Sequence, residues 1–181
     1  ISDILGKPDK AAEYRALYEN YRTAWRAKFL TGGEGGKTIC GTQTSYVLGI
    51  KFGLFDEDEM AEAAENLTKN IKSRGWHLTT GFLGLSYLNP VLSDTGYSDV
   101  AYKLLEQEEY PSWLYSVTTG STTIWESWYA FRTYADGSSA ANGESYNHFS
   151  YGAVSEWLFR YVLGIERDEN AVAYKHIILK P

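Results

Sequence analysis

The segment Thr122-Thr123-Ile124-Trp125-Glu126-Ser127-Trp128 places one carboxylate between two indoles. A second segment, Asn142-Gly143-Glu144-Ser145-Tyr146-Asn147-His148, follows it and again sets polar groups beside aromatic rings. Aromatic faces cover the apolar C–H face of a sugar ring, and a few polar groups fix its hydroxyls. The two segments therefore indicate a carbohydrate site around Glu126. The alternative is that Glu126 is an exposed residue at the edge of an aromatic core.

Size and charge exclude several classes of protein. The 181 residues are enough for one domain with a substantial core. The net charge of −6, with Lys and Arg scattered, argues against a nucleic-acid partner. No apolar run approaches the roughly 20 residues that span a bilayer, so we expect no membrane partner. The single cysteine, Cys40, excludes an intramolecular disulfide and leaves the cellular compartment open.

The chain start and the aromatic content are both unusual. Residue 1 is Ile rather than Met and no signal peptide is visible, which fits a processed chain or an excised piece. Aromatic residues make up 15% of the sequence. Most of them must lie in a core, because a large exposed apolar patch is costly. The surplus of Tyr and Trp, whose rings carry polar tips, also fits a cleft that binds carbohydrate.

Hydrophobic periodicity predicts an all-α fold of about seven helices with one C-terminal β-strand. Amphipathic helices alternate with more apolar ones, which is typical of two concentric layers with the apolar helices inside. The expected helices cover residues 8–29, 40–55, 56–74, 81–92, 97–109, a short segment after 111, and 146–163.

Within the first of these, one stripe is expected to face the core; it consists of Tyr14, Leu17, Tyr18, Tyr21 and Trp25. Residues 133–143 are expected to form a loop. Residues 175–181 are expected to form a strand without a partner in this chain.

Other familiar site patterns are incomplete. Gly36-Lys37-Thr38 matches the end of a phosphate loop, but the pattern needs Gly where Thr31 stands, and a helix rather than a strand precedes it. No Gly-x-Ser-x-Gly segment indicates a serine hydrolase. No Cys/His spacing indicates a metal site, so we expect neither a metal nor a cofactor. His77 is interpreted as a structural loop residue, and His176 as an ordinary exposed strand residue.

Six ordered segments carry a resemblance to a known family. They are Gly41-Thr42-Gln43-Thr44-Ser45-Tyr46, His77-Leu78-Thr79-Thr80-Gly81-Phe82-Leu83-Gly84, Tyr110-Pro111-Ser112-Trp113-Leu114-Tyr115, the Trp-Glu-x-Trp segment, Ser145-Tyr146-Asn147-His148-Phe149-Ser150-Tyr151-Gly152-Ala153-Val154, and Lys175-His176-Ile177-Ile178-Leu179-Lys180-Pro181. In order and spacing they resemble the bacterial α-L-rhamnosidases, which are inverting glycoside hydrolases with an (α/α)6 barrel.

The resemblance implies roles for particular residues. Glu126 would be the general base that deprotonates the attacking water, and His148 would contact the rhamnose hydroxyls. Trp125, Trp128 and Asn147 would complete the substrate-binding site. An inverting mechanism also requires a general acid, with its carboxyl about 6.5–9.5 Å from the base. The partner would be a rhamnose-containing glycoside or polysaccharide, whose linkage and aglycone the sequence does not determine.

One family feature is missing from these residues. In the family, the general acid lies upstream in an acidic Gly-Glu-Arg-type segment, and this sequence contains no such segment. Residues 1–171 are therefore expected to be the C-terminal portion of a partial (α/α)6 barrel, and residues 172–181 the start of a following β-sandwich. The chain alone is expected to be inactive. It is also expected to expose aromatic surface at the cut face of the barrel and to self-associate there.

Two other functions fit the same residues. The chain could belong to another (α/α)6 glycosidase, such as a glucosidase or an unsaturated glucuronyl hydrolase; the latter relies on Asp, so an essential Glu126 would weigh against it. The chain could instead be a non-catalytic helical module that binds sugar without turnover. If the aromatic clusters are only core, Glu126 should be buried and paired.

Overall fold

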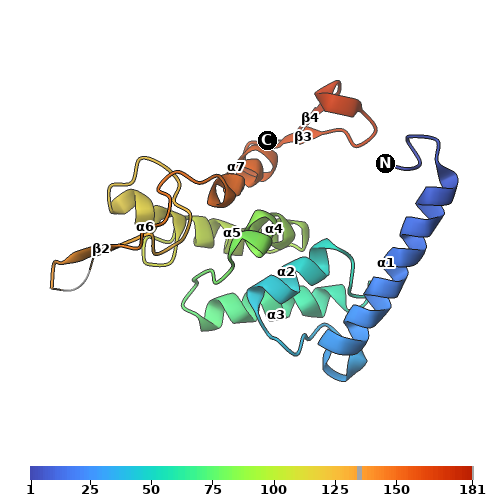
Figure 1. Ribbon diagram of the computed structural model, residues 1–181, viewed down its shortest axis with the longest axis horizontal. Coiled ribbons are helices and arrows are strands. Elements are labelled where there is room, and N and C mark those ends of the chain that lie inside the picture. Colours follow the sequence, from blue (N-terminus) through green and yellow to red (C-terminus); the bar gives the residue numbers. More distant parts are fainter. Residues whose placement is uncertain (134–135, 181) are drawn as a thin grey trace.

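The computed structural model describes residues 1–133 and 136–180, and Figure 1 shows their course. The described residues form seven α-helices and four short strands. The helices are α1 (Pro8–Phe29), α2 (Gln43–Lys51), α3 (Met60–Ser73), α4 (Phe82–Asp94), α5 (Ser98–Leu105), α6 (Trp113–Thr118) and α7 (Val154–Trp157). The strands β1 (Phe131–Thr133) and β2 (Ser139–Ala141) pair antiparallel, as do β3 (Ile165–Arg167) and β4 (Ile177–Leu179).

The centre of the fold is a pair of apolar helices, α2 and α4, covered by α3 and α5. Helix α2 packs against both α3 and α4, and α4 packs in turn against α5. Leu85, Leu88 and Leu92 of α4 are buried. By contrast, α3 buries only the face that carries Ala63, Leu67 and Ile71, and its charged residues lie in solvent. The predicted alternation of apolar inner and amphipathic outer helices is therefore confirmed.

Local sequence signals explain several helix ends. The side chain of Thr42 accepts a hydrogen bond from Ser45 N–H and caps α2. Helix α3 ends as predicted, with Gly75 in the left-handed region at φ 68°. Its start differs from the prediction, because the helix begins at Met60 rather than Asp56. The Glu59 carboxylate does accept from Asp56 N–H at 2.7 Å, but the Asp56 carboxylate binds arginines of α1 instead of completing a capping box.

Helix α1 lies at one end of the molecule (Figure 1). Its Trp25 ring packs against Phe55, and polar contacts with the residues after α2 add to this attachment. Tyr18, Arg22 and Arg26 follow one another at four-residue spacing and donate hydrogen bonds to backbone carbonyls of residues 52–55. These carbonyls follow the end of α2, where no helical donors are available. The prediction that the aromatic stripe faces the core is wrong for its first four residues, which are exposed at the surface: Tyr14, Leu17, Tyr18 and Tyr21.

The exposed stripe matches another of our expectations, because a partial barrel should present aromatic surface that another part of the barrel would cover. Two grooves of about 630 and 280 Å³ lie along α1, and the stripe contributes Tyr14, Tyr18 and Tyr21 to their walls. None of the described helices is both long and apolar enough to cross a bilayer.

Buried charges tie α1 to the start of α3. The Glu59 carboxylate is 8% exposed and accepts from both terminal nitrogens of the Arg26 guanidinium, at 2.6 and 2.8 Å. It also accepts from Gly35 N–H at 2.6 Å. Nearby, Gly36 allows the loop to touch α3, because an added Cβ would lie 2.4 Å from Ala63 N. The glycine-rich connection therefore packs closely against the start of α3, and the Glu59 carboxylate holds it there through the Gly35 N–H.

The C-terminal third departs most from the predicted elements. Residues 139–141 pair with β1, so the predicted loop over 133–143 is wrong there; Tyr134 and Ala135 lie outside the described residues. The expected helix over 146–163 begins only at a 3₁₀ turn, Ser150–Ala153, continues through α7 and ends in a π turn, Leu158–Val162. Residues 146–148 are not helical, because backbone hydrogen bonds of Ser145 and His148 tie this segment to the Glu126 segment.

The C-terminal strand also has a partner. Ile178 of β4 lies opposite Glu166 of β3, so the prediction of an unpaired strand is wrong. His176 is exposed, as expected, and its Nδ1 lies 2.6 Å from the Asp168 carboxylate. Pro181, the last residue of the predicted strand, lies outside the described residues.

Candidate functional site

A long hairpin brings the two predicted site segments together. His148 N–H donates to the Ile124 carbonyl at 2.8 Å, and Glu126 N–H donates to the Ser145 carbonyl at 2.9 Å. Farther along, Asn142 N–H donates to the Ala130 carbonyl at 3.0 Å, next to β1 and β2. Residues 123–133 and 139–148 therefore run antiparallel as one irregular hairpin, in which a turn at 127–130 interrupts the pairing next to β1. The candidate site lies at the base of this hairpin.

The sequence carried one signal for this hairpin. Asp136-Gly137 is a favoured turn pair, and Gly137 has φ 81°. The Asp136 carboxylate accepts from both the N–H and the hydroxyl of Ser138, which fixes the turn. This signal was missed because the surrounding Ser and Ala residues are poor strand formers.

Glu126 is half-buried and is held by one oxygen. Its Oε2 accepts a hydrogen bond from Ser145 N–H at 2.8 Å. No donor among the described residues reaches Oε1. One oxygen is therefore anchored to the hairpin backbone, and the other can accept a proton from a ligand or a water molecule.

The two indoles that flank Glu126 in sequence are packed into the protein. Trp125 is 7% exposed and makes edge-to-face contacts with Phe131 and Tyr146. The Trp128 ring stacks on Tyr151 with centroids 4.0 Å apart, and its Nε1–H donates to the Thr80 carbonyl. The two indoles thus form an apolar wall behind the hairpin. Although they flank Glu126 in the sequence, they do not enclose its carboxylate.

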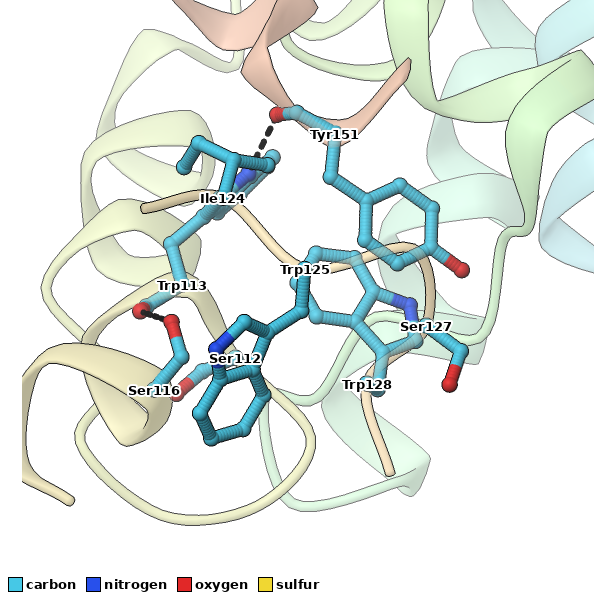
Figure 2. A pocket seen from close by; sticks show the side chains of 8 residues that line it. All are labelled: Ser112, Trp113, Ser116, Ile124, Trp125, Ser127, Trp128 and Tyr151. Atoms are coloured by element: carbon cyan, nitrogen blue, oxygen red, sulfur yellow. Dashed lines mark hydrogen bonds between the residues drawn. The ribbon is translucent and has the colours of Figure 1, made fainter. Parts of the chain in front are cut away.

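Figure 2 shows a cavity within this wall, with Trp113, Trp125 and Trp128 around it. Its volume is about 10 Å³, which is close to the space of a single water molecule. A sugar ring does not fit there. A larger open groove of about 270 Å³ lies beside Trp125 and Tyr146, lined by the hydroxyl-rich turn before the Glu126 segment. Glu126 and His148 line neither space.

His148 lies between two aromatic rings at the base of the hairpin. Phe82 stacks on it at 5.0 Å and 6°, and Phe149 stacks on it at 5.2 Å and 12°. Its Nδ1 lies 3.3 Å from Ser150 N–H and accepts from it. The neutral ring therefore carries its proton on Nε2, so His148 presents a hydrogen-bond donor.

Asn147 is exposed, and its backbone is fixed from Ser145. The Ser145 hydroxyl accepts from Asn147 N–H and donates to the Asn147 carbonyl, both at 3.1 Å. Ser145 therefore connects two site residues: its N–H donates to the Glu126 carboxylate, and its hydroxyl fixes the backbone of Asn147. No sequence pattern singles out this serine, because its contribution to Glu126 comes from the backbone.

A second acidic residue that the sequence analysis did not select lies beside Glu126. The Glu144 carboxylate accepts a hydrogen bond from the hydroxyl of buried Ser127. Burial and then the nearby Tyr129 and Glu144 raise the pKa of Tyr151 to about 12. The hairpin base thus holds two carboxylates in different roles, one with an open oxygen and one facing a buried hydroxyl.

His77 contacts residues of two other segments, and its interpretation as a structural residue stays a prediction. Its Nδ1 lies 3.4 Å from the Pro111 carbonyl, and its own carbonyl accepts from the buried Gln43 amide at 2.9 Å. Gln43 also accepts from Thr79 N–H at 2.7 Å and so joins α2 to the segment before α4. Among residues 1–133 and 136–180, no three His, Cys, Asp or Glu residues cluster as metal ligands would.

The family model described as the bacterial α-L-rhamnosidase six-hairpin glycosidase domain matches residues 1–162. The chain belongs to this family. An α-L-rhamnosidase of Formosa agariphila is 39% identical over 180 residues, which is 99% of this chain and 19% of that protein. An α-L-rhamnosidase of Streptomyces avermitilis is 38% identical over 177 residues, which is 98% of this chain and 16% of that protein.

Solved α-L-rhamnosidase structures share the fold. The Streptomyces avermitilis enzyme, crystallised with L-rhamnose, matches with a TM-score of 0.88 and 38% identity over 99% of this chain and 17% of that one. The Aspergillus terreus enzyme matches with a TM-score of 0.84 and 32% identity over 93% of this chain and 19% of that one. These neighbours are (α/α)6 barrels, so the predicted partial barrel is confirmed. The chain spans less than a fifth of the length of these rhamnosidases.

Proposed function

We propose that this chain is the base-bearing part of an inverting α-L-rhamnosidase that removes terminal α-L-rhamnose from glycosides or polysaccharides. The observation that carries the proposal is the Glu126 carboxylate, anchored at Oε2 and open at Oε1. This is the geometry that a general base needs, since one oxygen orients the group while the other accepts the proton. Family membership supplies the substrate class.

In the proposed reaction, Glu126 removes a proton from a water molecule while the water oxygen attacks the anomeric carbon. The bond from that carbon to the glycosidic oxygen breaks, and a general acid protonates the leaving oxygen. His148 donates from Nε2–H to a rhamnose hydroxyl, and exposed Asn147 offers its amide to another. Trp125 and Trp128 form the apolar wall that shapes the sugar site behind Glu126.

The general acid belongs to the part of the enzyme outside these residues. We propose that residues 1–171 are the C-terminal portion of the catalytic barrel and that residues 172–181 begin the following β-sandwich. The short β3–β4 pair would then connect the two. The matched rhamnosidases are about five times as long as this chain or longer, which leaves ample sequence for the missing helices and for the acid.

The test uses the complete enzyme of which we propose this chain to be a part. We expect it to hydrolyse p-nitrophenyl α-L-rhamnoside and to release β-L-rhamnose first, as observed by proton NMR before mutarotation. The 181-residue chain alone should release no nitrophenol, because it has a base without its acid. Release of the α-anomer first, or preference for a glucoside, would overturn the proposal. Binding of L-rhamnose without hydrolysis would instead indicate a sugar-binding module.

We also propose that the isolated chain self-associates through α1. The exposed aromatic stripe and its two flanking grooves form an uncovered apolar face, which is unusual for a monomeric soluble protein. We expect sedimentation velocity to show concentration-dependent dimers or larger species. Leu17→Glu together with Tyr21→Glu should restore a monomer, whereas Asn20→Glu on the same helix should not. A wild-type chain that stays monomeric at all concentrations would contradict the proposal.

A further inference from the structure

The hairpin base contains a second carboxylate that the proposed reaction does not use. Glu144 is half-buried, and its Oε2 accepts a hydrogen bond from the Ser127 hydroxyl. Ser127 is 9% exposed, so this hydrogen bond lies largely out of water. A buried hydroxyl that lost its partner would carry a desolvation cost, and the pair is therefore held together.

This pair lies directly beside the Glu126 anchor. Ser127 follows Glu126 in the chain, and Glu144 precedes Ser145, whose N–H donates to Glu126 Oε2 at 2.8 Å. Glu126 and Ser127 on one side of the hairpin are thus hydrogen-bonded to Ser145 and Glu144, respectively, on the other. The Glu126 N–H bond to the Ser145 carbonyl, at 2.9 Å, completes the set.

The peptide group between Glu144 and Ser145 connects the two interactions. A peptide group is planar, so the direction of the Ser145 N–H depends on where the Glu144 backbone lies. The Ser127 hydroxyl holds Glu144 through its side chain and thereby restrains this plane. If the peptide rotated, its N–H would turn away from Glu126, and the carboxylate would lose the one donor that orients it.

We propose that Ser127 and Glu144 are positioning residues, which hold the 144–145 peptide so that its N–H orients the carboxylate of Glu126. The catalytic part of this inference rests on the proposed function, whereas the structural part does not. Glu144 acts here as a hydrogen-bond acceptor, so its charge is not required. A glutamine at this position would keep the acceptor oxygen, whereas an alanine would remove it.

The first test needs only the 181-residue chain. In ¹⁵N-labelled protein, we expect the Ser145 amide to be protected from hydrogen exchange and to shift with pH as Glu126 ionises. Ser127→Ala should remove both properties while the amide signals of α2–α5 keep their positions. Ser116→Ala is the matched control, because Ser116 lines the same small cavity but donates to the Trp113 carbonyl. An unchanged Ser145 amide in Ser127→Ala would overturn the inference.

The second test measures the complete enzyme with p-nitrophenyl α-L-rhamnoside. Ser127→Ala and Glu144→Ala should each lower kcat by roughly 10- to 100-fold with little change in KM, since a misplaced catalytic group affects chemistry more than binding. The acidic limb of the pH–rate profile should move to higher pH, because loss of an N–H donor destabilises an ionised carboxylate. Ser127→Thr and Glu144→Gln should retain most of the rate.

The outcomes separate this inference from the proposed function. If the wild-type enzyme hydrolyses the rhamnoside and Ser127→Ala does so equally well, the positioning role is wrong and the proposed function stands. If Glu144→Gln is as inactive as Glu144→Ala, Glu144 has a role that depends on its charge, and the inference is also wrong. If the wild-type enzyme is inactive, the proposed function fails, and the amide measurements still decide the structural part.

Discussion

Replacing Glu126 by Gln is expected to lower kcat of the complete enzyme on p-nitrophenyl α-L-rhamnoside by about 10²- to 10⁴-fold, the range that general-base catalysis contributes. An amide cannot take a proton from the attacking water. Its oxygen can still accept the hydrogen bond from Ser145 N–H, so the hairpin should keep its geometry. KM should therefore change little, because substrate contacts such as that of His148 remain.

The control is a carboxylate that lies outside the candidate site. Glu65 lies in solvent on α3 and pairs with Lys69 at the surface, so Glu65→Gln should retain wild-type rates. In the 181-residue chain, Glu126→Gln should unfold at the same temperature as wild type to within a few degrees, which excludes loss of the fold as the cause. A Glu126→Gln enzyme that kept more than a tenth of the wild-type rate would exclude Glu126 as the general base.

The largest effect on stability is expected at Glu59. Glu59→Gln removes the charge that neutralises the Arg26 guanidinium, whose side chain is only 14% exposed. Breaking a buried pair by removing one partner typically costs about 3–5 kcal/mol. The loss should lie near the lower end of that range, because Asp56 also binds the Arg26 guanidinium, at 2.7 Å, and keeps part of its charge compensated. Urea unfolding of the 181-residue chain measures this loss. Glu62→Gln is the control, since exposed Glu62 also accepts from a glycine N–H but forms no ion pair with any residue that the structure describes, and it should cost well under half as much.

The same prediction has a pH dependence with a definite sign. The Arg26 hydrogen bonds first, and then those of the Asp56 and Gly35 N–H groups, lower the pKa of Glu59 from its ordinary value of 4.5 to about 2, although burial opposes the shift. A lowered pKa stabilises the fold above the unfolded value, and that stability is lost as the pH falls toward the folded value. The difference in unfolding free energy between wild type and Glu59→Gln should be largest above pH 4.5 and should shrink toward pH 2. A difference that stays constant over this range would contradict the ion-pair explanation.

The helical part of the fold was predictable because its signals are local. The spacing of apolar residues placed α1 to α5, and Gly75 marked the end of α3 as expected. The face of α1 that meets the rest of the chain was not predictable. From the sequence, Arg22 and Arg26 could lie in solvent as readily as the tyrosines. The carboxylates that bind these arginines, Asp56 and Glu59, lie about thirty residues away in the chain. Amphipathic periodicity describes a helix surface, and only the partner decides which side is covered.

The candidate site was predictable in its residues more than in its arrangement. The Trp-Glu-x-Trp segment identified Glu126, and the later segment identified His148, but their proximity comes from a hairpin that the sequence analysis expected as a loop. The expected enclosure of Glu126 by two indoles assumed that neighbours in sequence surround one another. The turn at 127–130 instead carries the two rings to different neighbours: Trp125 contacts Phe131 and Tyr146, whereas Trp128 stacks on Tyr151.

The hairpin also bears on the order in which the site assembles. Its cross-strand contacts join residues only 17, 19 and 23 positions apart, from Ser127 to Glu144, from Glu126 to Ser145 and from Thr123 to Tyr146. Closing such short loops costs little chain entropy compared with docking distant helices. The part of the site that carries Glu126 can therefore form as soon as about twenty-five consecutive residues have been synthesised. Because the acid-bearing part is proposed to lie upstream and is then already made, docking of this hairpin against it would be the step that completes the site.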